Sequence, residues 1–175
     1  MANRDARIRT VEEHVRCENE HDLAGLLQSF GTDARYDDEP WDEHHEGPDG
    51  VRGYYETLLQ AVPDLHIDVR RRHVTDETIV LEVIITGTHL GPWRGLPGTG
   101  RRLEFPLCGI YTFDADDRLN GEKIYYDRAT VLRQIGMFHE PFSGVGSVVT
   151  PLTHPVTMAR AIGRSLFRRN GHTPA

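Results

Sequence analysis

Long apolar runs are absent from this chain of 175 residues. No segment approaches the roughly 20 consecutive apolar residues of a membrane-spanning helix, and residues 1–9 are polar and charged, unlike the apolar centre of a secretory signal. Cysteine is scarce, because Cys17 and Cys108 are the only two and form no Cys-x-x-Cys motif. We therefore expect a cytoplasmic protein without membrane binding, and the cysteine pattern indicates neither a redox pair nor a zinc knuckle.

Positive charge is also in deficit. The chain has 20 Lys and Arg against 27 Asp and Glu, for a formal net charge of -7. Such a surface repels phosphate backbones, so we expect no nucleic-acid partner and look instead to small molecules and other subunits. The hydrophobic fraction of 38% is that of an ordinary globular domain, which at this length can form a core and a cavity without disulfides or metals.

Helical periodicity dominates the first third of the chain. Apolar residues recur at helical spacing in three segments, about 4–20, 23–30 and 48–62, and they predict three amphipathic helices. Asp22 is suited to cap the second helix, and Pro63 ends the third.

A period of two then replaces the helical period. Strands are predicted over about 65–70, 78–90, 101–113 and 119–126, with a glycine-rich loop at 91–100 and a closing helix at 129–135. The order predicts an α+β domain whose helices gather on one face of a curved antiparallel sheet and leave a pocket for a small apolar ligand.

The residues after this domain differ in character. We expect residues 1–136 to form the main domain and 137–175 a C-terminal extension. Within the extension, residues 158–169 predict an amphipathic helix, on which a basic stripe lies opposite apolar residues. The stripe comprises Arg160, Arg164 and Arg168, and the apolar residues are Ile162 and Leu166.

Three segments together resemble the SnoaL-like polyketide cyclases of the nuclear-transport-factor-2-like (NTF2-like) superfamily. They are 86–102 (TGTHLGPWRGLPGTGRR), 104–113, and 125–136 (YYDRATVLRQIG). The resemblance implies a cone-shaped α+β barrel, a homodimer formed through the open sheet, and no metal or organic cofactor. It also implies ring closure by an intramolecular aldol reaction.

Asp127 falls where these cyclases carry their acid-base aspartate, and it is our candidate catalytic residue. An aldol closure needs a base for the proton next to a carbonyl and an acid for the new alkoxide, and one carboxylate can serve both steps. An apolar cup would raise its pKa. Asp127 is equally suited to cap the following helix. His89, on the apolar face of its strand, is the second catalytic candidate, with loop capping as the alternative.

Other polar and aromatic residues are candidates for binding substrate. Trp41 and Trp93 would form the rim of the cup, and one residue of each Tyr-Tyr pair should face inward. Arg101 and Glu104 lie on a predicted hairpin and could equally face solvent in cross-strand pairs. The substrate-binding candidates are therefore Trp41, Tyr54, Trp93, Arg101, Glu104 and Tyr125.

The acidic run at 37–46 contains His44 and His45 but matches no metal-binding spacing, so a solvated loop is favoured over a metal site.

For the chain as a whole we expect a cofactor-free cyclase, or a related isomerase or lyase, that acts on an apolar carbonyl compound. The alternative is a non-catalytic ligand-binding or assembly module of the same fold. An epoxide-hydrolase-like activity would need a second aspartate and an arginine beside Asp127.

Overall fold

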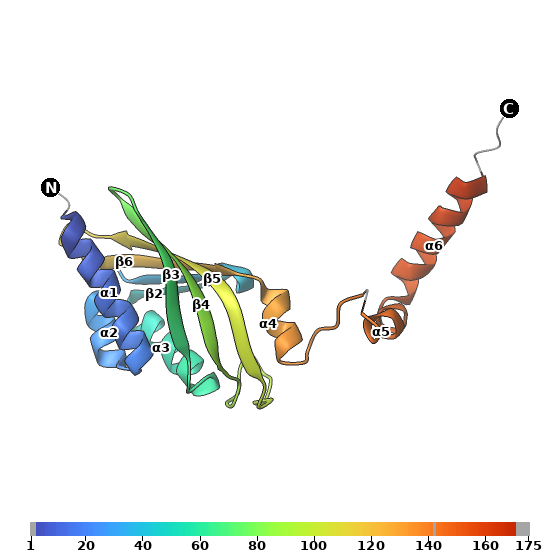
Figure 1. Ribbon diagram of the computed structural model, residues 1–175, viewed down its shortest axis with the longest axis horizontal. Helices are drawn as coiled ribbons and strands as arrows, with labels where there is room; N and C mark the ends of the chain where they lie inside the picture. Colours follow the sequence, from blue (N-terminus) through green and yellow to red (C-terminus); the bar gives the residue numbers. More distant parts are fainter. Residues whose placement is uncertain (1–2, 142, 171–175) are drawn as a thin grey trace. The chain divides into compact units, whose positions relative to one another are not determined.

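The computed structural model describes residues 3–141 and 143–170 and divides the chain into two compact units, residues 1–136 and 137–175. In the first unit, helices lie on one face of a curved six-stranded sheet (Figure 1). The helices of the first unit are α1 (Arg4–Glu20), α2 (Leu23–Ser29), α3 (Gly47–Ala61) and α4 (Arg128–Gln134), with a short 3-10 helix, η1 (Glu39–Trp41).

The helix starts follow from local chemistry. The side chain of Asn3 accepts a hydrogen bond from the Ala6 amide and caps α1, and that of Asp22 accepts one from Gly25 and caps α2. Gly47 opens α3 with a φ of 71°, a backbone conformation that favours glycine, and Pro48 occupies the first turn. These contacts confirm the three predicted amino-terminal helices.

The sheet has the strand order β2-β1-β6-β5-β4-β3. Its neighbours are antiparallel except β1 and β6, which run parallel. The strands are β1 (Arg35–Asp38), β2 (Glu43–Glu46), β3 (His66–Val74), β4 (Thr78–Thr88), β5 (Arg102–Phe113) and β6 (Leu119–Tyr126).

This arrangement of helices and strands confirms the predicted α+β class.

The prediction of a solvated loop at 37–46 is wrong, because this run forms the β1–η1–β2 hairpin. Asp37 is buried on the hairpin, where its carboxylate accepts a hydrogen bond from Arg35 and pairs with His44 at 2.7 Å. Burial raises the pKa of Asp37, but the hydrogen bonds from Arg35 and His44 outweigh it, so its pKa is lowered.

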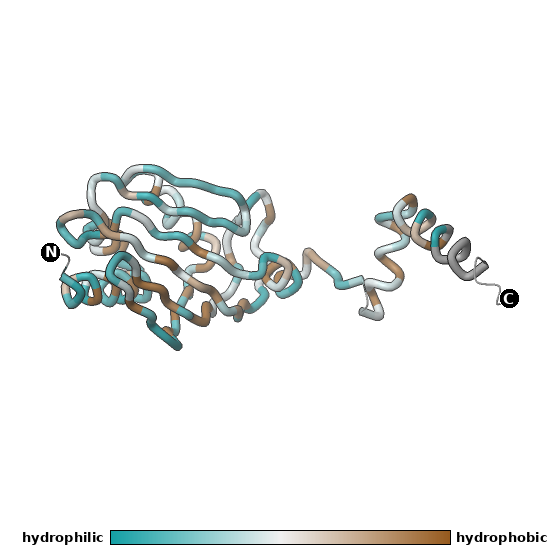
Figure 2. Tube along the Cα trace, turned by 90° about the horizontal axis from the view of Figure 1, so that it is seen from above, coloured by the Kyte–Doolittle hydropathy of each residue, from teal (hydrophilic) through white to brown (hydrophobic). Residues whose placement is uncertain are grey.

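The core lies between the helices and the concave face of the sheet. Side chains at alternate positions of β4, from Ile79 to Ile85, are buried there, whereas Val80 and Ile84 on the outer face are only half-buried. Figure 2 shows apolar (brown) and polar (teal) stretches along the chain of the first unit. The inner face of the sheet is therefore the apolar wall against which a ligand site can form.

The glycine-rich loop between β4 and β5 is tightly shaped. A Cβ atom at Gly91 would lie 2.0 Å from the carbonyl oxygen of Gln60, and one at Gly98 would lie 2.0 Å from that of Leu90. Only glycine allows the backbone to approach this closely. The loop is thereby held against the carboxyl end of α3.

The second unit contains α5 (Gly146–Thr153) and α6 (Pro155–Asn170). The predicted helix at 158–169 falls within α6, whereas α5 was not predicted. The side chains of 163 and 165–170 lie outside the described residues, and with them Leu166 and Arg168 of the predicted amphipathic pattern. Among the described helices of either unit, none is long and apolar enough to span a bilayer.

Candidate active site

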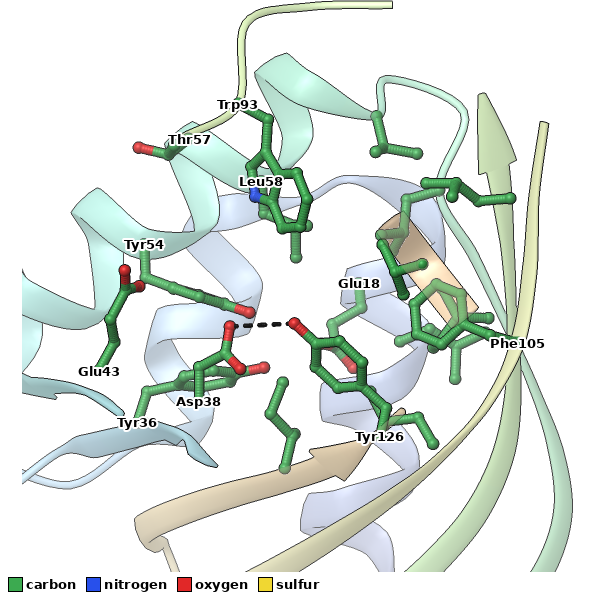
Figure 3. A pocket seen from close by; sticks show the side chains of 18 of the residues that line it. Glu18, Tyr36, Asp38, Glu43, Tyr54, Thr57, Leu58, Trp93, Phe105 and Tyr126 are labelled. Carbon is green, nitrogen blue, oxygen red and sulfur yellow. Dashed lines mark hydrogen bonds between the residues drawn. The ribbon is translucent and has the colours of Figure 1, made fainter. Parts of the chain in front are cut away.

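A cavity of about 360 Å³ lies in the first unit between the sheet and the helices (Figure 3). Most of its wall is apolar or aromatic and includes Leu58, Val83, Ile85, Leu103, Phe105 and Ile124. The polar groups in the wall include Glu18, Asp38, Glu43, His89, Arg94 and Glu122. An apolar hollow with a few convergent polar groups is the usual form of a small-molecule site.

Strand parity places Asp38 in this cavity. Successive residues of a strand point to opposite faces, so Tyr36 and Asp38 face inward from β1 while Asp37 between them faces the other way. The parallel partner β6 has the same parity, because Tyr36 lies opposite Glu122 and Asp38 opposite Ile124. Two carboxylates, from Asp38 and Glu122, thus enter the cavity from adjacent strands.

Asp38 is 1% exposed, and its carboxylate is only partly satisfied. Its Oδ2 accepts hydrogen bonds from Arg94 Nη2 at 3.0 Å and from the Tyr126 hydroxyl at 3.3 Å. Its Oδ1 is buried with no hydrogen-bond partner among the described residues. Burial, opposed by Arg94, raises the pKa of Asp38 to about 6. A carboxyl group in this state can exchange a proton with a ligand near neutral pH.

Arg94 is held over the cavity by a tight turn. Trp93 and Leu96 exchange two backbone hydrogen bonds of 2.8 Å, and the two residues between them, Arg94 and Gly95, have φ values of 49° and 80°. This is the geometry of a two-residue hairpin turn, which requires positive φ at both central positions. The Arg94 guanidinium lies 4.3 Å from the Trp41 ring and 5.1 Å from that of Trp93.

Tyrosine hydroxyls surround Asp38. The Trp41 Nε1–H donates to the Tyr126 hydroxyl at 2.7 Å, which leaves the Tyr126 proton free to point toward Asp38. The rings of Tyr36 and Tyr54 stack with centroids 4.1 Å apart, and the Tyr54 hydroxyl also points toward Asp38 (Figure 3). Burial raises the pKa of Tyr54 and of Tyr126, so both remain hydrogen-bond donors.

His89 reaches the cavity wall, as its strand parity indicated. Its ring is 1% exposed, its Nδ1 lies 3.1 Å from the Thr99 hydroxyl, and its Nε2 is buried with no hydrogen-bond partner among the described residues. Burial lowers the pKa of His89, which favours a neutral imidazole. A neutral ring in this position can orient a ligand but carries no charge.

The prediction that Asp127 lies in the cavity is wrong. Asp127 is exposed and is not part of the cavity wall; its carboxylate caps α4, where it accepts hydrogen bonds from the Ala129 amide at 2.9 Å and the Thr130 hydroxyl at 2.5 Å. These bonds, led by that from Thr130, lower its pKa, opposite to the rise that an acid-base role would need. The capping alternative describes Asp127.

The structure separates the predicted binding residues into two groups. Tyr54 and Trp93 line the cavity, whereas Trp41 is not part of its wall but packs against Trp93, with ring centroids 5.3 Å apart. The other three were predicted wrongly, because their side chains are exposed and do not form the wall: Arg101, Glu104 and Tyr125.

Sequence reasoning missed four residues of the site. One signal was available, because the apolar Ile124 marks the inward face of β6 and, at a spacing of two, assigns Tyr126 rather than Tyr125 to the cavity. Nothing comparable marked Asp38, whose partner Arg94 lies 56 residues away along the chain. The missed residues are Asp38, Arg94, Glu122 and Tyr126.

A curved sheet and helices that enclose an apolar cavity with buried acids define an α+β protein with an internal small-molecule cavity. Residues 8–135 match the family described as SnoaL-like polyketide cyclase. The chain therefore belongs to the SnoaL-like polyketide cyclase family. No curated protein matches the sequence.

Solved structures support the same fold. AclR from Streptomyces galilaeus is 22% identical with a TM-score of 0.71, and the match covers 98% of this chain and 100% of AclR. TsrD from Streptomyces laurentii is 22% identical with a TM-score of 0.69, over 79% of this chain and 100% of TsrD. An NTF2-like protein of unknown function from Burkholderia pseudomallei is 18% identical with a TM-score of 0.65, over 75% and 98%.

Proposed function

We propose that the protein is an acid-base enzyme, a SnoaL-like cyclase or a related isomerase or lyase, that acts on a small, largely apolar carbonyl compound. Asp38 is the proton-transferring residue. The proposal is supported most by one feature, the Asp38 carboxylate. It is buried in an apolar cavity, its Oδ1 has no hydrogen-bond partner in the part of the chain that the structure describes, and its pKa is raised to about 6. Membership of the family supports the reaction class.

The proposed reaction begins with ionised Asp38. Its free Oδ1 removes a proton from the carbon next to the ligand's carbonyl group, and the electron pair moves onto the carbonyl oxygen. The Tyr54 hydroxyl lies in the same part of the cavity and can donate a hydrogen bond to the enolate oxygen, while Tyr126 donates its proton to Asp38. Protonated Asp38 then returns its proton to the product, so that one residue acts as base and acid.

The cavity wall supports an apolar substrate of moderate size. A volume of about 360 Å³ is at the lower end of the range for sites that enclose drug-sized ligands. Phe105 and Trp93 offer flat faces to an aromatic or polycyclic compound, and polar groups are confined to a few positions. The proposed substrate class is therefore an aromatic or polycyclic ketone rather than a sugar or a nucleotide.

The function can be tested without the natural substrate. In D₂O, we expect the protein to accelerate deuterium uptake at the carbon next to the carbonyl in some of a panel of bicyclic and tricyclic ketones, as measured by mass spectrometry. Cyclases, isomerases and lyases of this kind share that proton abstraction. If ketones bind with micromolar affinity and none exchanges faster than in buffer, the non-catalytic ligand-binding alternative replaces the enzymatic one.

A further inference from the structure

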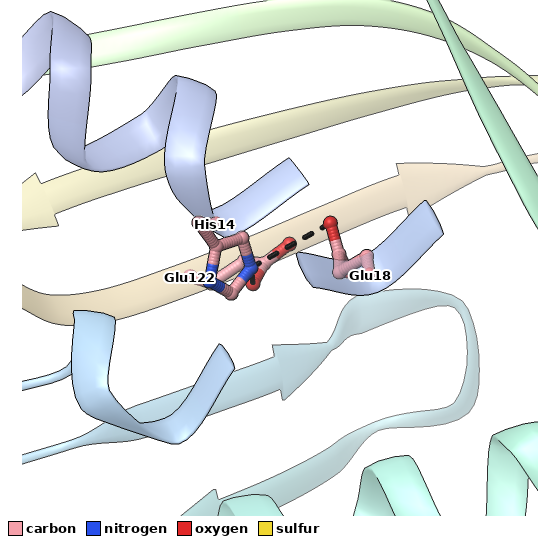
Figure 4. A group of neighbouring side chains, drawn as sticks. All are labelled: His14, Glu18 and Glu122. Carbon is pink, nitrogen blue, oxygen red and sulfur yellow. Dashed lines mark ion pairs between the residues drawn. The ribbon is translucent and has the colours of Figure 1, made fainter. Parts of the chain in front are cut away.

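A second cluster of buried polar groups lies beside the cavity, formed by His14 and Glu18 of α1 and Glu122 of β6 (Figure 4). The three side chains are 0%, 6% and 3% exposed, and their ligand atoms lie within 4.8 Å of one another. Glu18 and Glu122 also belong to the cavity wall. The reaction proposed for Asp38 uses none of these groups.

Hydrogen bonding fixes how the His14 ring is oriented. The Ser29 hydroxyl donates to the Leu26 carbonyl oxygen at 2.6 Å, so it has no second hydrogen and must accept one from His14 Nδ1, which lies 2.8 Å away. Neutral His14 thus carries its hydrogen on Nδ1 and directs the lone pair of Nε2 at the two glutamates. A histidine held through its other ring nitrogen in this way is typical of metal ligands.

The two glutamates complete a set of metal-ligand atoms around Nε2. His14 Nε2 lies 3.0 Å from Glu122 Oε2 and 3.6 Å from Glu18 Oε2. Ligand atoms about 2.1 Å from a shared metal ion are separated by about 3.0 Å at a right angle and by about 3.6 Å at 120°. These two separations therefore suit a shared ion, and the three ligand atoms all lie within 4.8 Å of one another.

An unsatisfied atom indicates that the cluster lacks a partner. The Tyr55 hydroxyl has one proton for three acceptors, Glu18 Oε1 at 2.9 Å, Glu122 Oε2 at 3.0 Å and His14 Nε2 at 3.3 Å. Glu18 Oε2 is buried with no hydrogen-bond partner within the described part of the chain. Two buried carboxylates facing one imidazole leave uncompensated negative charge, which is costly away from water.

We propose that His14, Glu18 and Glu122 bind a divalent first-row transition-metal ion, such as Mn²⁺ or Zn²⁺. One imidazole and two carboxylates are ligands that both ions accept, and two carboxylates neutralise the charge of the ion. Because both glutamates line the cavity, open coordination positions would face an oxygen atom of a bound ligand. This inference departs from the sequence-based expectation that no metal is involved, and it does not depend on the reaction proposed for Asp38.

A proton is the competing occupant of the cluster. Burial raises the pKa of Glu18 to about 7. Burial alone would lower the pKa of His14, but Glu18 and Glu122 outweigh it and raise that pKa. A metal ion and a shared proton satisfy the same negative charge. A metal titration distinguishes them, because a metal-binding cluster exchanges its proton for the ion, whereas a cluster that only shares a proton binds no ion.

The test is calorimetric titration of the full-length, chelator-treated protein with MnCl₂ and with ZnCl₂. We expect binding of one ion per chain, with the affinity lowered at least about tenfold in Glu18→Gln, which keeps the shape of the side chain, and about 10–100-fold in Ser29→Ala, which removes only the support of the ring. Should Glu18→Gln fail to fold, Ser29→Ala decides the question.

The matched control is Glu82→Gln, which alters an exposed glutamate 2.8 Å from His73. The proposal requires that this variant bind the ion as the unaltered protein does. It is overturned if neither ion binds, or if Ser29→Ala binds with unchanged affinity, because the cluster would then be a proton-sharing element of the core.

Discussion

Replacing Asp38 with Asn is expected to slow ketone deuterium exchange by roughly 10²–10⁴-fold, the usual contribution of a general base. The amide cannot accept the proton, but it fills the same volume and still accepts hydrogen bonds from Arg94 and Tyr126. The rate of deuterium uptake in a ketone that the unaltered protein exchanges is the measurement. Ligand affinity should change little, because the cavity wall is otherwise intact.

The same variant should not lose stability at about pH 8. Because the folded-state pKa of Asp38, about 6, lies above its ordinary value of 3.8, the ionised carboxylate disfavours folding above pH 6, and this penalty disappears as the pH falls toward 4. Each unit of pKa corresponds to about 1.4 kcal/mol, so Asp38→Asn could raise the free energy of unfolding by up to about 3 kcal/mol. Urea unfolding at two pH values measures this effect.

Asp127→Asn provides the matched control, because it is the same substitution at a residue outside the cavity. Asparagine is as good a helix cap as aspartate, so α4 should keep its first turn and exchange should proceed at the unaltered rate. Loss of exchange in Asp127→Asn, with exchange retained in Asp38→Asn, would return the acid-base role to the residue that the family resemblance indicated.

Replacing Arg94 with Ala is expected to shift the acidic limb of the exchange-rate profile upward by at least about one pH unit. Arg94 opposes the effect of burial on Asp38, so without it the pKa of that carboxyl rises above 6. Because only ionised Asp38 can accept a proton, activity would be lost at a higher pH than in the unaltered protein. The measurement is the exchange rate of one ketone between about pH 5 and pH 9.

Arg128→Ala is the control for lost stacking. The Arg128 guanidinium lies 4.9 Å from the same Trp41 ring that Arg94 covers. Within the described residues, Asp38 accepts a hydrogen bond from Arg94 but none from Arg128. The profile of Arg128→Ala should coincide with that of the unaltered protein. If Arg94→Ala also gave an unshifted profile, the group that limits exchange at low pH could not be Asp38.

Much of the fold was predictable because its signals are local. Helical spacing and the cap at Asp22 define α2, alternation defines β3, and a nearly continuous β-branched run defines β4, since each pattern arises from residues close together in the chain. The β1–η1–β2 hairpin gave no such signal. Its acidic run suggests a solvated loop until the cations that face it are known, and one of them, Lys123, lies on β6.

Residues of the candidate site were predictable only where the apolar face of a strand indicated which side chains point into the cavity. His89 shares the face of Ile85 on β4, and its position in the cavity followed from that parity. Asp38 could not be distinguished from its neighbours, because its burial and its pKa depend on Arg94 and Tyr126, which are distant in sequence. Asp127 was placed in the cavity because of the family resemblance, and no local pattern in the sequence indicates how far a residue lies from a cavity. Its capping role, which depends on neighbouring residues, was predictable.

The most direct measurement is a ¹³C NMR titration of the aspartate carboxyl groups, with and without a bound ketone. One aspartate should titrate near pH 6, its signal should be missing from Asp38→Asn, and ligand binding should shift its midpoint, since the ligand meets that carboxyl group directly. If every aspartate titrates below about pH 5, or the signal near pH 6 persists in Asp38→Asn, no proton is held at Asp38 for exchange with a ligand and the account is contradicted.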